Sequence, residues 1–366
     1  MSRAPRDRRV SVRDLAAQLG VSNATVSRAL NDHPEVSSET RARVLELAAV
    51  SGYQVKTRKP ATPTIGLAYP TDPVRPDHGS FESAMLSGVL RGINEQRFDV
   101  TWVNVERDKS PHESHVEFFR RKGLSGVIVR TIVPESEIGE ELASEGFPCV
   151  LMADRSDDAR VNCIWSDSRA DSARAVDHLV HLGHTRISIV SHTFLDSDHR
   201  DRRDGYLEGL RRHGIDPDPG LIVSSIGTLD GGRQAIERLL SLESPPTAIY
   251  FTTPPATLGA LQRCLELGIA VPKELSIVGF DDSDTRFHSF PHYTAVCQDA
   301  QQMGFEAARW LTRSISGMHD GPLRERRPTT FSVQQSTAIR PLQMVRLTPA
   351  GVARIDSSPG GGASQP

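Results

Sequence analysis

Residues 10–31, VSVRDLAAQLGVSNATVSRALN, constrain the fold of this chain most, because they place two short helical patterns around one tight turn. In the first pattern, residues 12–19, the apolar side chains recur at helical spacing and share one face. Gly20 follows, and it can adopt the left-handed conformation that ends a helix at little cost. Ser22 then caps a second helix. The apolar side of that second helix is formed by Val26, Ala29 and Leu30.

A third helical pattern follows in SSETRARVLELAAVSGY, which Ser37 or Ser38 caps and Gly52 ends. Helices this short are unstable alone, so we expect the three to close over one miniature core. Two helices joined by such a turn resemble a DNA-binding helix-turn-helix, whose second helix enters the major groove. The sequence therefore predicts a DNA-binding head.

The charge of the chain is distributed in agreement with such a head. The chain carries 43 Lys and Arg and 46 Asp and Glu, of which the first 60 residues hold 11 and 6. The head is therefore basic, and the remainder is acidic. A basic head on an acidic body indicates that the head, and not the body, meets a polyanion.

From residue 65 onward, short β-rich runs from IGLAY to TAVC alternate with helical patterns. Alternation of this kind predicts parallel sheets with helices on both faces, and the number of runs favours two α/β lobes. The predicted fold class is α/β, with a small all-α head before a two-lobed core. The helical patterns are residues 81–96, 170–182, 203–213 and 232–242.

Neither export nor disulfide bonding is indicated. The basic N-terminus is followed by no apolar signal core, and no apolar run is long enough to span a bilayer. The cysteines lie far apart and form no C-x-x-C pair, so buried free thiols in a reducing cytoplasm are the simplest interpretation. These cysteines are Cys149, Cys163, Cys264 and Cys297.

The motifs together resemble one family. The head reads R-D-L-A-A-x-x-G-V-S-x-x-T-V-S-R-A-L-N, followed by V-S-x-x-T-R-x-R-V and G-Y. The body carries T-I-G-L at 64–67, H-L-x-x-L-G-H-x-R-I at 178–187 and S-I-V-G-F-D-D at 276–282. In this order they resemble the LacI family of bacterial transcription regulators, whose core is similar to periplasmic sugar-binding proteins.

The resemblance implies a division of the chain. The expected parts are a head at 1–53, a linker at 54–64, a core at 65–341 and a disordered tail at 342–366. Within the core, one lobe comprises about 65–165 and 298–326, and the other about 166–297 and 327–341. The function implied is a sequence-specific regulator, a repressor that binds a near-palindromic operator as a homodimer and responds to a sugar-like effector. Part of the dimer surface would come from residues 81–96.

The resemblance also implies which head residues meet double-stranded DNA. Asn23 and Ala24 open the second helix at positions that vary with operator sequence, and Arg28 is placed for a guanine or a phosphate. The remaining expected contacts are mostly hydroxyl and amide donors suited to phosphates. These are Val12, Arg13, Ser22, Thr25, Ser27 and Asn31.

The expected effector site lies between the lobes, where carboxylates, amides and Arg would bridge sugar hydroxyls. Its residues are Phe81, Asp154, Arg202, Asp281 and Gln298. Two of them have a second interpretation, because Asp154 could form a local ion pair with Arg155 and Asp281 could cap a helix.

Two segments depart from the family pattern. The linker is short, lacks leucine and contains Pro60 and Pro63, which favours a basic arm over the family's minor-groove helix. Thr253 and Pro254 stand where the family usually has an Asn-Asp pair. The effector could therefore be unusual, weakly bound or absent, and a regulator controlled by a protein partner or by no ligand is the alternative.

Other functional classes find little support. The chain lacks G-x-S-x-G, a phosphate-binding loop, a dinucleotide fingerprint and H-E-x-x-H, so we expect no enzyme and no cofactor. His178, His181 and His184 could suggest a metal cluster, but Gly183 interrupts the helix before the third, and a helix end fits them better. A transport solute-binding protein is opposed by the DNA-binding head.

Overall fold

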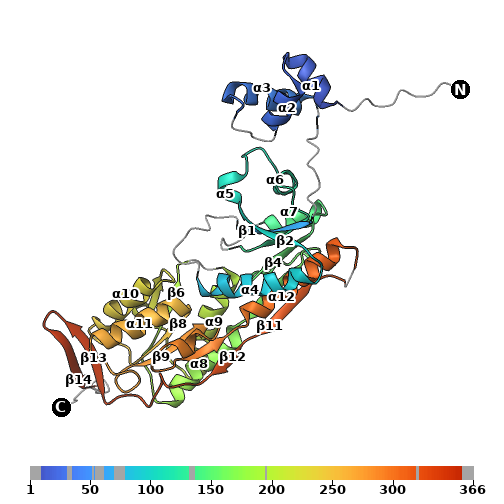
Figure 1. The fold of residues 1–366 in the computed structure, drawn as a ribbon. Coiled ribbons are helices and arrows are strands. Elements are labelled where there is room, and N and C mark those ends of the chain that lie inside the picture. Colours follow the sequence, from blue (N-terminus) through green and yellow to red (C-terminus); the bar gives the residue numbers. More distant parts are fainter. Residues whose placement is uncertain are drawn as a thin grey trace, which may run out of the picture. The chain divides into compact units, whose positions relative to one another are not determined.

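The structure is a computed structural model, which describes residues 10–30, 35–51, 53, 62–69, 79–131, 137–193, 196–318 and 321–356. The chain divides into two compact units, residues 1–59 and 60–366, which we call the head and the body. Figure 1 labels their elements. Within the described residues, every helix is too short or too polar to cross a membrane.

The head consists of three helices, as predicted, and glycine and serine caps set several of their ends. Gly20 ends the first helix with a φ of 66°. Ser22 Oγ accepts a hydrogen bond from the backbone N–H of Thr25 at 3.0 Å and so starts the second. Ser37, rather than Ser38, caps the third. The helices are α1 (Val12–Leu19), α2 (Asn23–Leu30) and α3 (Ser38–Val50).

The three helices share one small core. Leu15, Val26 and Val44, one from each helix, are completely buried. Because each helix is too short to be stable alone, this common core holds the head together. The buried core residues are Leu15, Ala16, Val26, Ala29, Val36, Val44 and Ala48.

Two six-stranded sheets form the framework of the body. The first has the strand order β11-β5-β4-β3-β1-β2, and the second has the order β12-β10-β9-β8-β6-β7. Neighbouring strands are parallel except that β12 pairs antiparallel with β10. The first sheet contains β1 (Thr64–Tyr69), β2 (Asp99–Asn104), β3 (Gly126–Val129), β4 (Cys149–Met152), β5 (Cys163–Asp167) and β11 (Arg324–Pro328). The second contains β6 (Ile187–His192), β7 (Ile222–Ser225), β8 (Ala248–Phe251), β9 (Ser276–Asp281), β10 (Thr294–Cys297) and β12 (Thr330–Ser332).

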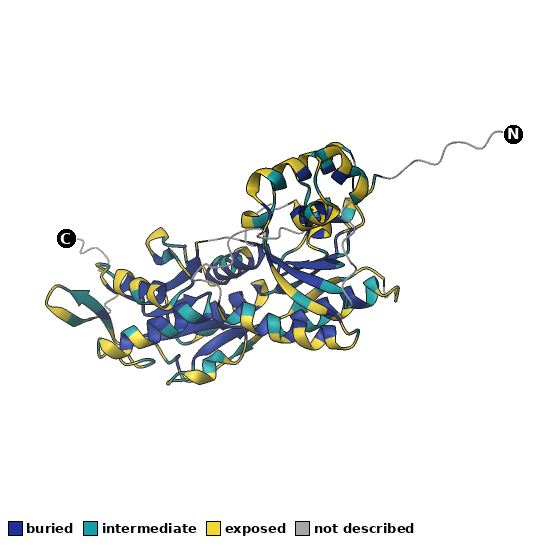
Figure 2. Cartoon of the chain, turned by 45° about the horizontal axis from the view of Figure 1, so that its top comes forward, coloured by how far each residue is buried: buried dark blue, intermediate teal, exposed yellow. Residues whose placement is uncertain are grey.

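Each sheet and its helices form one lobe. Every residue of β3, β4 and β8 is buried, which explains why these strands are continuously apolar in sequence. Figure 2 shows the buried residues along the strands and the inward faces of the helices. The first lobe has α4 (Ser80–Asn94), α5 (Val105–Asp108), α6 (His115–Arg121), α7 (Ile138–Ser144) and α12 (Ala300–Ile315). The second has α8 (Arg169–His181), α9 (Ser197–Arg212), α10 (Leu229–Leu240), α11 (Pro254–Glu266) and the 3₁₀ turns η1 (Pro219–Leu221) and η2 (Thr285–His288).

Helices α4 and α12 pack closely although they lie far apart in sequence (Figure 1). A Cβ atom at Gly88 would come within 1.9 Å of the carbonyl oxygen of Gln301, so only glycine permits this approach. Within the described residues, the chain passes between the lobes after β5, β10 and β11. Three segments of the described part of the chain therefore join the lobes.

The prediction of a disordered tail from residue 342 is wrong for the described part of that tail. Strands β13 (Gln343–Thr348) and β14 (Gly351–Asp356) form an antiparallel hairpin. Val345 is buried in the core of the second lobe, and Arg354 forms an ion pair with Glu274 at 2.5 Å. Alternating apolar residues stabilise this hairpin, whereas the Gly- and Ser-rich composition belongs to residues 357–366, which lie outside the described residues.

Candidate nucleic-acid interface and ligand pocket

The expected DNA-binding residues lie on the surface of the head. Most are exposed, namely Arg13, Ser22, Asn23, Ala24, Ser27 and Arg28. Val12 and Thr25 are partly buried: Val12 packs against the core, and the Thr25 hydroxyl lies 2.8 Å from that of Ser22. Asn31 and the linker residues 54–61 lie outside the described residues. At the start of α2, the exposed Asn23 and Ala24 therefore present an uncharged amide group and a methyl group.

Arg28 is held by a neighbour. Its Nη1 lies 3.2 Å from Oε2 of Glu35, and the two side chains are 55% and 64% exposed. An ion pair this exposed is weak and can exchange for a phosphate or a base. Glu35 therefore competes with any anion that Arg28 could bind.

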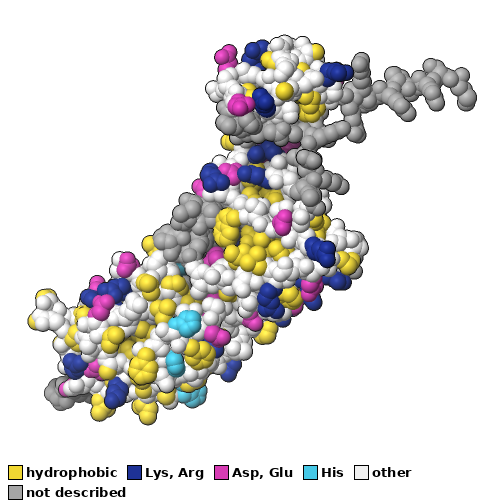
Figure 3. Space-filling view, viewed as in Figure 1, with side chains coloured by type: hydrophobic (Ala, Val, Ile, Leu, Met, Phe, Trp, Pro, Cys, Tyr) yellow, Lys and Arg dark blue, Asp and Glu magenta, His cyan; other side chains and the backbone are white. Residues whose placement is uncertain are grey.

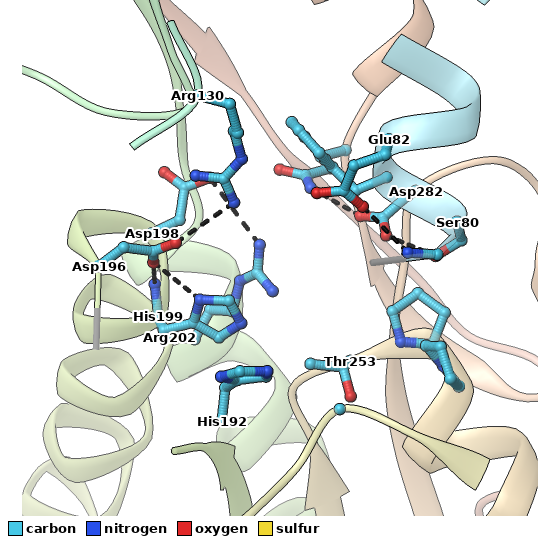
Figure 4. A pocket seen from close by; sticks show the side chains of 16 residues that line it. Ser80, Glu82, Arg130, His192, Asp196, Asp198, His199, Arg202, Thr253 and Asp282 are labelled. Atoms are coloured by element: carbon cyan, nitrogen blue, oxygen red, sulfur yellow. Dashed lines mark hydrogen bonds and ion pairs between the residues drawn. The ribbon is translucent and has the colours of Figure 1, made fainter. Parts of the chain in front are cut away.

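A pocket in the body is lined from both lobes. Figure 4 shows Ser80, Glu82 and Asp282 facing Asp196, Asp198 and His199 across it. Of the predicted effector residues, Phe81, Arg202 and Gln298 line the pocket. The complete lining is Gly79, Ser80, Phe81, Glu82, Arg130, His192, Asp196, Asp198, His199, Arg202, Gly227, Thr253, Pro254, Pro255, Asp282 and Gln298.

Asp281, another predicted effector residue, lies outside this pocket. Its carboxylate accepts hydrogen bonds from the backbone N–H of Thr285 at 2.9 Å and from Nη1 of Arg286 at 2.5 Å. Asp281 therefore bonds to the start of η2, although the N-cap position of that turn belongs to Asp284. The next residue, Asp282, points to the pocket in its place.

Asp154 also lies outside the pocket lining, where it connects the lobes. Its carboxylate accepts hydrogen bonds from the Thr131 hydroxyl and, at 2.8 Å, from the hydroxyl of Ser197 in the second lobe. The neighbouring Arg155 pairs with Asp201 through two bonds of 2.7 and 3.1 Å. The predicted local pair between Asp154 and Arg155 is thus replaced by two contacts between the lobes.

Asp196 organises one wall of the pocket. It caps α9, because its Oδ1 accepts hydrogen bonds from the backbone N–H of His199 at 2.8 Å and from its ring at 2.7 Å. Arg130 of the first lobe reaches the same carboxylate at 3.3 Å. Burial alone would raise the pKa of Asp196, but His199 and Arg130 outweigh it and hold the pKa below its usual range. Asp196 is therefore a carboxylate that ties the two lobes together.

Asp198 and Arg202 lie one helical turn apart on α9 and are 2% and 5% exposed. Their charged groups are 3.9 Å apart. Arg202 also donates to the carbonyl of Thr252 at 2.7 Å and lies 3.5 Å above the ring centre of Phe280. Burial and the negative charge of Asp196 raise the pKa of Asp198 well above its usual range. The positive charge of Arg202 thus balances the negative charge of Asp198 only in part.

The opposite wall is held by Asp282. It accepts hydrogen bonds from the hydroxyl of Ser80 at 2.9 Å and from the amide of Gln298 at 2.6 Å. Ser80 begins α4 in the first lobe, so this contact also bridges the lobes. Burial raises the pKa of Asp282, and nearby Arg202 opposes that shift.

The pocket floor includes the departure from the family pattern. Thr253 precedes α11, and Pro254 begins it, so neither offers a carboxylate or amide side chain. Polar groups on α9 supply acceptors instead. The sequence pattern placed the helix at 203–213, whereas α9 begins at Ser197, and Asp196, Asp198 and His199 were therefore missed. The sequence feature that could have revealed the earlier start of α9 is the D-x-D-H motif at 196–199, because Asp is a strong N-cap residue.

The three histidines considered as a metal cluster have separate partners. His178 Nε2 lies 2.9 Å from the hydroxyl of Thr337, and the His181 ring bonds to the carbonyl of its own helix. His184 bonds to Thr247, and burial lowers its pKa to about 4. These three histidines therefore form separate hydrogen bonds within the second lobe.

Comparison with known proteins identifies the family. Residues 11–55 match the bacterial regulatory proteins of the lacI family, and residues 176–337 match the periplasmic binding protein-like domain. The chain is 30% identical over 319 residues to the HTH-type transcriptional regulator MalR of Streptomyces coelicolor, covering 83% of this chain and 90% of that protein. The chain belongs to the LacI family. The predicted fold class and family are thereby confirmed.

Other LacI-family proteins extend this similarity. The catabolite control protein A of Priestia megaterium is 28% identical over 317 residues, covering 84% of this chain and 93% of that protein. The structure of the transcriptional regulator CelR in complex with cellobiose is 26% identical with a TM-score of 0.63, covering 90% and 100% of the two chains. This LacI-family chain is therefore a DNA-binding transcriptional regulator and not an enzyme.

A LacI-family regulator from Enterococcus faecium, solved with bound ribose, has the same body fold. Its TM-score is 0.64 at 24% identity, and the match covers 75% of this chain and 99% of that one. The two-lobed body is thus common to regulators that differ widely in sequence.

Proposed function

We propose that this regulator is a repressor, which binds a near-palindromic operator as a homodimer and is modulated by a small molecule in the pocket between its lobes. The observation that carries the proposal is the pocket, because it is built from buried polar side chains of both lobes. A ligand that contacts both walls changes the equilibrium between lobe angles, and so changes DNA affinity.

In this proposal, α2 reads the operator. Asn23 pairs with adenine through two hydrogen bonds, Ala24 contacts a thymine methyl, and Arg28 binds guanine or a phosphate. Their exposure supports this assignment. The remaining predicted contacts fix the position of the head on the phosphate backbone. They are Val12, Arg13, Ser22, Thr25, Ser27 and Asn31.

Glu35→Gln is expected to tighten operator binding up to about fivefold, because it releases Arg28 and removes a negative charge near the DNA. The measurement is a fluorescence-anisotropy titration with the selected operator. Glu39→Gln removes the same charge at an exposed position in the first turn of α3, and is the control. Equal effects of the two variants would show that the Arg28–Glu35 pair does not limit binding.

An apolar surface supports the homodimer. Leu90 on α4 is 46% exposed and Trp102 on the edge strand β2 is 42% exposed, and Leu86 and Val100 of the same two elements are partly buried. Figure 3 shows hydrophobic side chains gathering over this region. A second copy would cover this surface, and two heads would then bind two operator half-sites.

Trp102→Asp is expected to convert the dimer to a monomer and to weaken operator binding at least tenfold, because a charge enters an apolar interface and each monomer carries one head. Sedimentation equilibrium and anisotropy measure the two effects. Thr101→Asp places the same charge on the other face of β2 and serves as the control. A Trp102→Asp protein that remains dimeric would remove this surface from the interface.

The solved complexes of CelR with cellobiose and of the Enterococcus faecium regulator with ribose support a sugar-like effector. The alternative is a regulator that responds to a protein partner or to no ligand. It is favoured by the contacts that already bridge the lobes, Arg130–Asp196, Ser197–Asp154, Arg155–Asp201 and Ser80–Asp282. As a chromosomal regulator, the protein would act in the cytoplasm on the nucleoid.

The proposed function is tested by selecting bound sites from random DNA with the purified chain and then titrating the selected operator. A near-palindromic site, bound by two chains per duplex, is the expected result. Selection of no consensus, or binding of one chain to an asymmetric site, overturns the homodimeric repressor. Calorimetry with sugars then separates the ligand-controlled form from the alternative.

A further inference from the structure

Leaving aside Arg130, four buried side chains of the pocket retain a polar atom that has no hydrogen-bond partner among the described residues. These side chains are between 2% and 9% exposed, so bulk water does not satisfy them. An unpaired buried polar atom is costly, and a ligand that pairs with it recovers that cost. The atoms are Asp198 Oδ1, Gln298 Oε1, His199 Nε2 and Arg202 Nε.

Two of these atoms, Asp198 Oδ1 and Gln298 Oε1, are hydrogen-bond acceptors. Gln298 uses its Nε2 to donate to Asp282, which leaves its oxygen as the free end of the amide. His199 uses Nδ1 to bond to Asp196, which leaves Nε2 as its second polar atom. With Asp198, the pocket therefore offers two oxygen acceptors. Its ligand must supply hydrogen-bond donors.

The charges of the pocket select among donor-rich ligands. Four acidic side chains, Glu82, Asp196, Asp198 and Asp282, line it beside two arginines. Both guanidinium groups already have partners within the protein. Arg130 binds the carbonyl of Thr131 at 2.6 Å and reaches Asp196, and Arg202 binds the carbonyl of Thr252.

Asp198 is the acidic group with the least compensation. It is 2% exposed, one of its oxygens lacks a partner in the described part of the chain, and its nearest guanidinium nitrogen is 3.9 Å away. The upward pKa shift of this carboxyl agrees with that shortage of positive charge. A ligand phosphate or carboxylate would add a further negative charge here, whereas an ammonium group would supply the missing positive one.

Resting on the proposed role of this pocket as the effector site, we propose that the effector is a polyhydroxylated amine, such as an amino sugar, whose ammonium group binds Asp198. Its hydroxyl groups donate to Gln298 Oε1 and hydrogen-bond with His199 Nε2. The aromatic ring of Phe81, over which Arg130 lies at 5.0 Å, closes one side of the pocket. Sugar acids and sugar phosphates are disfavoured by the same carboxylates.

The test is calorimetry of the full chain with matched compounds that share one ring. In each of the glucose, galactose and mannose series, the 2-amino sugar is compared with the neutral parent, its N-acetyl derivative, the uronate and the 6-phosphate. We expect at least one amine to bind about tenfold or more tightly than its neutral parent, with the anions weakest.

Asp198→Asn tests the assigned partner. It keeps the size of the side chain and removes its charge, so the advantage of the amine over its neutral parent should fall to less than about threefold. Asp204→Asn makes the same change at a half-exposed position of α9 and should keep the full advantage. Circular dichroism melting confirms that both variants are folded.

Each other outcome overturns the inference in a distinguishable way. A neutral or anionic sugar that binds best and changes operator affinity overturns the amine and leaves the ligand-controlled regulator intact. Binding by no compound, with operator binding preserved, overturns the amine and favours the ligand-independent alternative. An unchanged amine preference in Asp198→Asn removes Asp198 as its partner. If the wild-type chain recognises no operator, the proposed function itself is overturned.

Discussion

Leu15→Ala abolishes operator binding and leaves the body folded: this is the expected result of removing the central side chain of the head. Leu15 is completely buried between the three helices. Truncation of a buried leucine to alanine costs about 2–5 kcal/mol. A core of this size supplies no more than about 3–5 kcal/mol in total. The substitution therefore removes most or all of the stability of the head.

The tryptophans allow the two units to be followed separately. Trp102, Trp165 and Trp310 all belong to the body, so tryptophan fluorescence reports its unfolding alone. We expect an unchanged fluorescence melting temperature and an operator affinity reduced by more than about 100-fold. Gln18→Ala, at an exposed position of α1, should change neither quantity. Full operator binding by Leu15→Ala would contradict the three-helix core.

Arg202→Met is expected to destabilise the body by about 3 kcal/mol or more. The substitution leaves Asp198 buried without its nearest cation and removes the hydrogen bond to the carbonyl of Thr252. Removing one member of a buried ion pair costs about 3–5 kcal/mol, because the other charge stays uncompensated. The measurement is urea unfolding followed by tryptophan fluorescence, compared with the wild-type chain.

The double variant Asp198→Asn with Arg202→Met separates the charge from the packing. Because it removes both charges, it should recover about 1–3 kcal/mol relative to Arg202→Met alone. Arg200→Met lies on the exposed side of the same helix and should change the free energy of unfolding by less than about 0.5 kcal/mol. A double variant that recovers nothing would show that Arg202 stabilises the lobe through its contact with Phe280 instead of through Asp198.

Much of the architecture was predictable because local signals and tertiary packing agree. The bounds of α1 follow from apolar spacing and Gly20, and the strands buried on both faces are visible as short apolar runs. The hairpin at 343–356 was missed because the composition of the last residues was extended to the whole tail. Strand β5 was missed because its sequence, CIWSD, has no strong apolar run.

The pocket was predicted in part. Phe81, Arg202 and Gln298 line it, but Asp281 turns away and Asp282 takes the position. The alternation of residues along β9 does not reveal whether Asp281 or Asp282 forms hydrogen bonds with the turn that follows the strand. Asp196, Asp198 and His199 escaped prediction because their position depends on where α9 begins and on Arg130 from the other lobe.

The most direct test of the central claim, that α2 reads the operator, is a footprinting titration of the selected operator with wild type and Arg28→Ala. Arg28 is 55% exposed on α2, and its pairing with Glu35 is weak enough to exchange for DNA. We expect the substitution to weaken specific binding by about 1–3 kcal/mol and binding to random DNA by less. Unchanged operator affinity would contradict the assignment of α2 as the reading helix.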